Sequence, residues 1–191
     1  MSVMKNILAE AEIEEEIPRD FAIYDLVQFL NGVTLHDNPS IEFPNESNLT
    51  IREGKDRKTK YFFADPSVIV SPPEKSIQLP TEDVCFKLDS TQLQSLLKAS
   101  AVYQLPDLVA VGEAGVVKLV VRDKKNDTSN EYSINVGETD QEFNFNFKVE
   151  NIKILPGTYE VVISQKLLAR FVNTNFNLTY FIALEPDSTF G

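Results

Sequence analysis

A short amphipathic helix pattern lies among predicted strands twice in this chain, and this repeat constrains the fold more than any single residue. In the first copy, apolar residues follow the i, i+3, i+4, i+7 spacing of one helical face at Leu26, Phe29, Leu30 and Val33. In the second copy, the same spacing occurs at Leu93, Leu96 and Leu97. Because short strands follow each helix, the repeat predicts a chain assembled from duplicated helix-plus-sheet units.

A proline-rich segment divides the chain. Residues 65–80 contain four prolines, which fix φ and remove backbone donors, so the segment is expected to be an extended connector. We therefore expect a partial N-terminal domain at residues 1–65, an interdomain connector at 66–80 and a C-terminal domain at 81–191.

The hydrophobic pattern predicts the following elements. Before the connector we expect a strand at 5–17, a helix at 21–34 and strands at 40–43, 48–52 and 58–64. After it we expect a helix starting at Asp89, a second helix at 148–155, and strands at 84–88, 108–112, 116–122, 131–136, 142–147, 159–164, 168–173 and 179–184. The repeated unit thus occurs twice after the connector and once before it. This asymmetry predicts a chain that begins inside its first domain, through a misassigned start codon or as a natural short form.

Composition and chemistry exclude several classes of protein. The net charge of −11 argues against ordinary nucleic-acid binding, and no apolar run is long enough for a membrane span. A single cysteine permits no intrachain disulfide, which together with the lack of a signal-peptide pattern favours a cytoplasmic protein. The one histidine, His36, is expected at the surface, and Cys85 in the core. Without a Cys–His cluster or a glycine-rich phosphate loop, we predict no enzyme activity, metal or cofactor.

The chain resembles a known family in an ordered set of segments. These are Asp20–Leu26, Ala64–Val70, Leu93–Lys98, Leu155–Tyr159 and Ala183–Thr189. Each is weak alone, but together they follow the order found in the DNA polymerase sliding clamps of myovirus-type tailed bacteriophages, relatives in fold of eukaryotic PCNA. The departure is at the front, where the first strand-helix-two-strand unit of the family is absent.

The resemblance implies a fold and a function. The fold would be the α+β DNA-clamp fold, with antiparallel sheets outside and short helices lining a ring, three of them from this chain. The protein would be a non-enzymatic homotrimer that encircles double-stranded DNA and tethers the viral DNA polymerase in the cytoplasm of the infected bacterial host. A clamp loader would load it, and late transcription factors associated with RNA polymerase are further possible partners.

The resemblance also implies three sets of site residues. The DNA-facing set is Lys98, Lys148 and Lys153. The partner-peptide pocket is Val68, Val70, Phe181, Ala183, Leu184 and Pro186. The subunit interface is Thr59, Tyr61, Phe63, Glu131, Tyr132 and Ile134.

Alternatives remain open for these residues and for the protein. The aromatic residues at 61–63 could be ordinary core, and the two valines of the connector could pack on their own domain. A β-rich structural or accessory phage protein is the alternative function. An enzyme acting through His36 is a more distant one.

Overall fold

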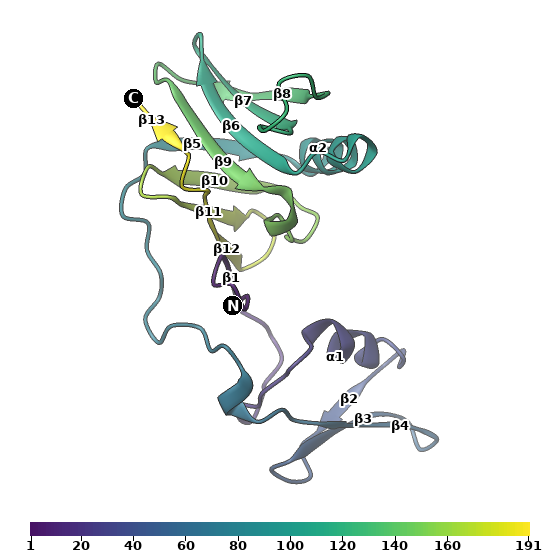
Figure 1. Cartoon of the computed structure of the whole chain (residues 1–191). Coiled ribbons are helices and arrows are strands. Elements are labelled where there is room, and N and C mark those ends of the chain that lie inside the picture. The colour runs from purple at the N-terminus through teal and green to yellow at the C-terminus, as the bar shows by residue number, and fades with distance from the viewer. The chain divides into compact units, whose positions relative to one another are not determined.

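Three antiparallel sheets and two α-helices make up the chain, which the computed structural model describes from Met1 to Gly191 (Figure 1). These elements divide into two units. The smaller unit is Glu15–Ser71, and the larger one combines Met1–Glu14 with Pro72–Gly191.

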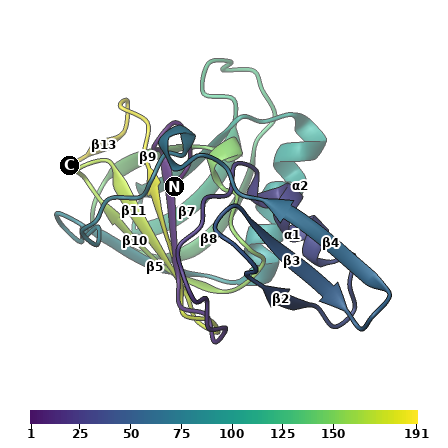
Figure 2. The same cartoon turned by 90° about the horizontal axis from the view of Figure 1, so that it is seen from below.

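The smaller unit is a three-stranded sheet with one helix on it. The strands are β2 (Ser40–Glu42), β3 (Asn48–Glu53) and β4 (Arg57–Phe62), in the order β2-β3-β4 (Figure 2). Helix α1 (Leu26–Val33) places Phe29 against Leu49 and Ile51 of β3, and a 3₁₀ turn, η1 (Pro66–Val68), follows the sheet. This unit is held by a small aromatic cluster around Phe29 rather than by a long apolar sheet face.

The larger unit contains two five-stranded sheets. The first has the order β1-β12-β11-β10-β5 and the second the order β13-β9-β6-β7-β8. The strands of the first are β1 (Ile7–Ala11), β5 (Val84–Leu88), β10 (Tyr159–Ser164), β11 (Leu168–Asn173) and β12 (Leu178–Ala183). Those of the second are β6 (Asp107–Glu113), β7 (Val116–Arg122), β8 (Tyr132–Glu138), β9 (Phe143–Lys148) and β13 (Thr189–Phe190).

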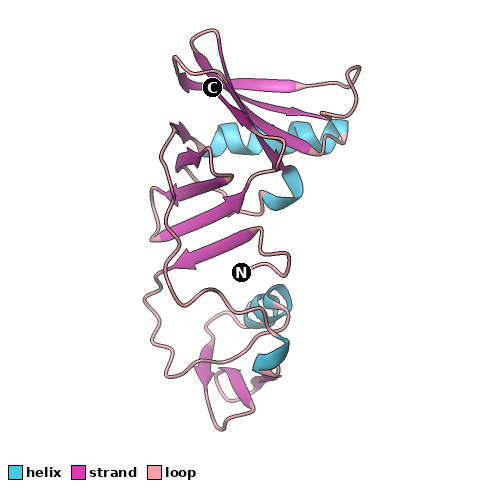
Figure 3. Cartoon of the chain, turned by 60° about the vertical axis from the view of Figure 1, so that its left-hand side comes forward, coloured by secondary structure: helices cyan, strands magenta, loops and turns pink.

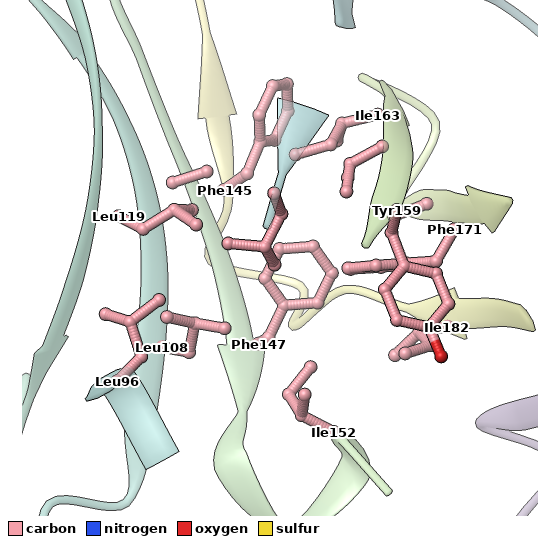
Figure 4. Packing of buried hydrophobic residues seen from close by; sticks show 14 of the residues in the cluster. Leu96, Leu108, Leu119, Phe145, Phe147, Ile152, Tyr159, Ile163, Phe171 and Ile182 are labelled. Carbon is pink, nitrogen blue, oxygen red and sulfur yellow. The ribbon is translucent and has the colours of Figure 1, made fainter. Parts of the chain in front are cut away.

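Alternate residues of both sheets, together with helix α2 (Ser90–Tyr103), form one hydrophobic core (Figure 4). Phe147 of β9 meets Phe171 of β11 with ring centroids 6.2 Å apart, so the two sheets touch through their aromatic side chains. Helix α2 contributes Leu96, which is almost fully buried, and packs beside β7 and β8 (Figure 3). Burial of this apolar surface is the main stabilising contribution to the unit.

The N-terminal strand is shorter than expected and joins a different sheet. β1 ends at Ala11 instead of 17, and Leu8 pairs with Phe181 of β12. Residues 1–14 therefore group with the C-terminal unit, whereas the sequence placed them in an N-terminal domain of residues 1–65. The hydrophobic pattern identifies a strand, but not the edge with which its backbone pairs.

The prediction of a helix at 148–155 is wrong. Only a 3₁₀ turn, η2 (Val149–Asn151), forms there, so the chain has two α-helices instead of three. β9 extends to Lys148, and the amide of Val149 donates to the carbonyl of Pro106. The few residues left before Pro156 are too few to nucleate an isolated helix.

Helix α1 is also shorter than predicted. Asp25 is its N-cap, because its carboxylate accepts a hydrogen bond of 2.9 Å from the amide of Gln28. The apolar stripe is only partly buried, since Leu26 and Leu30 are 57% and 51% exposed. Phe21, outside the helix, packs in the cluster instead.

Candidate functional site

Helix α2 presents Lys98 to solvent. Asp89 and Gln92 form a reciprocal capping box at the start of the helix. The amide of Gln92 donates to the Asp89 carboxylate at 2.8 Å, and the amide of Asp89 donates to the Gln92 side-chain oxygen at 3.0 Å. Leu93 and Leu96 are buried on one side, whereas Lys98 is exposed. Its ammonium group makes no ion pair in the structure, so it is free to contact an anion.

Lys148 has very different surroundings from Lys98. Its Nζ donates to Oδ1 of Asp107 at 2.5 Å, and the Asp107 side chain is only 1% exposed. This hydrogen bond raises the pKa of Lys148, so the ammonium stays charged. The charge of Lys148 therefore compensates a buried carboxylate, and this ammonium group is less available to bind a phosphate.

Lys153 follows the η2 turn instead of lying on a helix, and it is exposed. Asn151 anchors the turn, because its side-chain oxygen accepts from Asn6 Nδ2 at 2.9 Å. Of the three predicted DNA-facing lysines, Lys98 and Lys153 are thus accessible. Lys148 is committed to Asp107.

The residues predicted for a partner-peptide pocket differ in exposure. Val68 and Pro186 are exposed, Val70 and Ala183 are half-buried, and Phe181 and Leu184 are buried. Leu184 belongs to the hydrophobic core. The two valines lie in the smaller unit and the other four residues in the larger one, so their grouping into a pocket stays a prediction.

The C-terminal tail is tied to β9 by a polar network that was not expected from the sequence. The amide of Asn146 donates to Ser188 Oγ at 2.9 Å, and the amide of Glu185 donates to the Asn146 carbonyl at 2.7 Å. Lys124 forms an ion pair of 2.7 Å with Asp187, and this lysine lowers the pKa of the Asp187 carboxyl. The tail is therefore held against β9 by hydrogen bonds and an ion pair. The alternation in Phe143-Asn144-Phe145-Asn146 places the asparagines on the face of β9 away from the core, where Asn146 is buried under the tail and needs polar partners.

The predicted interface residues lie on two free sheet edges or directly beside them, since Phe63 follows β4 and Glu131 precedes β8. β4 pairs only with β3, and β8 pairs only with β7, so each has one side without a backbone partner. Tyr61 and Phe63 pack against the smaller cluster, and Tyr132 and Ile134 against the larger core. These four side chains are turned inward, and the backbone of each strand is what the edge presents.

His36 and Cys85 lie opposite to expectation. His36 is buried, with Nε2 3.0 Å from Thr59 Oγ1, since the turn after α1 folds onto β4. Cys85 is exposed, because strand alternation gives the core positions to Val84 and Leu88. Partial desolvation raises the pKa of the Cys85 thiol, which disfavours the nucleophilic thiolate.

Two further features bear on chemistry. No group of three or more histidine, cysteine or carboxylate side chains is arranged to hold a metal ion. None of the helices has the length and apolar character required to cross a bilayer.

Comparison with known proteins gives matches along almost the whole chain. Residues 1–71 match the family model described as DNA polymerase processivity factor, and residues 85–186 match gp45 sliding clamp, C terminal. The sliding clamp of Vibrio phage KVP40 is 35% identical over 185 residues, covering 93% of this chain and 82% of the relative. The sliding clamp of Escherichia phage RB69 is 35% identical over 191 residues, covering 95% of this chain and 82% of that protein.

Solved structures show the same fold at low sequence identity. The PCNA2–PCNA3 complex from Sulfolobus tokodaii matches with a TM-score of 0.65 and 12% identity, over 97% of this chain and 84% of that one. The DNA polymerase III β subunit from Borrelia burgdorferi matches with a TM-score of 0.67 and 16% identity, over 94% and 50%. The α+β clamp fold inferred from the sequence is therefore confirmed.

Proposed function

The chain belongs to the sliding clamp family of bacteriophage DNA polymerase processivity factors, and from this we propose that it forms a closed homotrimeric ring around duplex DNA. The observation that carries the proposal is the pair of family matches over residues 1–71 and 85–186. A clamp acts as a scaffold without enzymatic chemistry. Its work would take place in the cytoplasm of the infected bacterial host, where the viral DNA polymerase meets its template.

Enclosure explains how an acidic protein can act on DNA. A ring of three copies holds the duplex topologically, so its grip does not depend on a large number of phosphate contacts. Exposed Lys98 and Lys153 would supply weak, sequence-independent contacts that position the duplex and allow sliding. The net charge of −11 per chain would keep DNA away from the remaining surface.

Ring closure would use the free edges of β4 and β8. Pairing of β4 from one copy with β8 of the next extends one sheet across the seam through backbone hydrogen bonds. The inward position of Tyr61 and Tyr132 supports this arrangement, because strand addition needs an open backbone edge rather than exposed aromatic side chains. A head-to-tail contact of this kind closes when the rotation between copies is one third of a turn.

Partner proteins would dock through short peptides with hydrophobic anchors. We assign this pocket to Val68 and Val70 with the last strand and tail, where Ala183 and Pro186 are the accessible members. Of the two buried members, Phe181 lies on the face of β12 away from the core and would line the pocket, whereas Leu184 packs in the core. The viral DNA polymerase and the clamp loader are the expected occupants, and coupling to RNA polymerase for late transcription would use the same surface.

Primer extension on a singly primed circular single-stranded template tests the proposal. With the phage polymerase, clamp loader and ATP, adding this protein is expected to lengthen the products made in one binding event. Omitting the loader should remove the effect on circles. A structural or accessory phage protein, the alternative function, would leave product length unchanged, and that result would overturn the clamp assignment.

A further inference from the structure

We propose that the charges on the free edges of β4 and β8 select head-to-tail pairing, in which cationic β4 of one copy pairs with the acid-flanked β8 of another rather than with a second β4. This inference rests on the proposed ring, and it adds a rule for which edges can meet. The partner is a second copy of this chain. The rule follows from three observations: the charge of β4, the charge around β8, and the direction of their side chains.

β4 concentrates positive charge in an acidic protein. Its six residues, Arg57–Phe62, contain three basic side chains and no acidic one, although the whole chain carries −11. Thr59 and Tyr61 turn toward the small unit's core, so Lys58 and Lys60 lie exposed on the opposite face. Neither lysine forms an ion pair in the structure.

Beside Lys60, the exposed face of β4 also carries Phe62. The ring is 61% exposed, and the Lys60 Nζ lies 4.6 Å from its centroid. The edge therefore combines an uncompensated charge with an apolar anchor, as a surface suited to one particular partner does.

β8 has the opposite character. Its seven residues contain Glu138 and no basic side chain, and Glu131 and Asp140 flank it. Glu131 and Glu138 are exposed and make no ion pair. Between them the outward positions are Ser133 and Asn135, small polar residues that leave room for longer side chains from a partner strand.

These two patterns rank the possible edge pairings. Two β4 strands would bring three cationic residues from each copy together, and two β8 strands would bring their glutamates together, so both like-with-like pairings are repulsive. β4 with β8 is attractive in either strand direction, because acidic residues stand at both ends of β8. Repulsion of the wrong pairings directs the copies toward a head-to-tail chain, which is the contact that can close into a ring.

Lysines on a sheet edge also have an opposite role, as a deterrent against any strand pairing. The two roles predict opposite results when the charge is changed. If Lys58 and Lys60 only deter pairing, removing their charge strengthens association. If they select β8, reversing their charge abolishes association, and reversing the acids of β8 in the same chain restores it.

The test measures mass by light scattering over a dilution series for four proteins. These are the wild type, K58E/K60E, E131K/E138K and the variant with all four changes. We expect each double variant to dissociate at concentrations at least about tenfold above the wild type, and the fourfold variant to recover most of the affinity. Raising the salt concentration should weaken assembly of the wild type. K5E/K166E, with the same change of net charge as K58E/K60E at exposed positions away from both edges, should assemble normally.

The outcomes separate this rule from the ring itself. A wild type that stays at 21.5 kDa at every concentration overturns both. A wild type that assembles while K58E/K60E assembles equally well or better overturns only the charge rule, as does a fourfold variant that stays dissociated. Circular dichroism of each variant shows whether a failure to assemble reflects unfolding instead.

Discussion

At the scale of single residues, two lysines with the same charge have different roles because their surroundings differ. Lys98 is exposed on α2, whereas Lys148 donates to the nearly inaccessible carboxylate of Asp107. A charge in water is available to a phosphate. A charge beside a buried carboxylate is part of the folded structure, and its removal leaves that carboxylate uncompensated.

Substitution of the two lysines should therefore give opposite results. K98A should leave stability unchanged and weaken DNA binding, and the slope of log K against log salt should become shallower by about one for each copy whose Lys98 no longer neutralises a phosphate. K148M should lower the free energy of unfolding by on the order of 2 kcal/mol. Urea titration and salt-dependent DNA binding measure both, with K166A as a control for the missing charge. Equal stability losses in K98A and K148M would contradict this distinction.

The ion pair of the tail predicts a pH dependence. Lys124 lowers the pKa of Asp187 below its ordinary value of 3.8, so this interaction stabilises the fold fully above that value. The contribution is lost as the pH falls through the lowered folded pKa. D187N should therefore be less stable than the wild type at neutral pH and indistinguishable from it in strong acid. Urea midpoints under both conditions measure this, and a difference that persists in acid would point to another role for Asp187.

At the scale of elements, local signals located the strands and the caps better than they located the partners. The capping box of Asp89 and Gln92 identified the start of α2, and the alternation at 143–147 identified β9. The helix expected at 148–155 failed because β9 and the Pro106 contact occupy its first residues. β13 was missed since a two-residue strand has no periodicity of its own.

Removal of the α2 cap tests how much the local signal contributes. D89A should lower the free energy of unfolding by about 1 kcal/mol, because one amide of the first turn loses its acceptor and Gln92 loses its reciprocal partner. D25A, the matched change at the cap of α1, should affect the smaller unit by no more than that. Urea titration followed by circular dichroism measures both. No loss in D89A would show that packing of Leu93 and Leu96 alone determines where α2 begins.

At the scale of the whole molecule, the proposed ring makes retention on DNA a matter of topology. A protein that holds DNA by enclosure leaves through a free end, whereas one that binds phosphates leaves when salt replaces it. The two mechanisms therefore respond differently to DNA shape and to salt.

Retention on circular DNA distinguishes these mechanisms. After loading onto nicked circles, we expect this protein to remain bound through gel filtration at about 0.5 M salt, where exposed charges are strongly screened but an enclosed duplex cannot leave. Cutting the circle once should release the protein through the new ends. Retention on linear DNA at the same salt concentration would contradict enclosure.

The amino-acid sequence indicated the class of the protein through its resemblance to a known family, and by itself it determined the positions of most strands and the start of α2. These strands and this helix start depend on residues that are near neighbours in the chain, where periodicity and capping act directly. Only the tertiary structure decided that β1 pairs with β12, that His36 is buried against Thr59, and that Lys148 neutralises Asp107. These contacts join residues distant in sequence, and their energies depend on which groups folding removes from water.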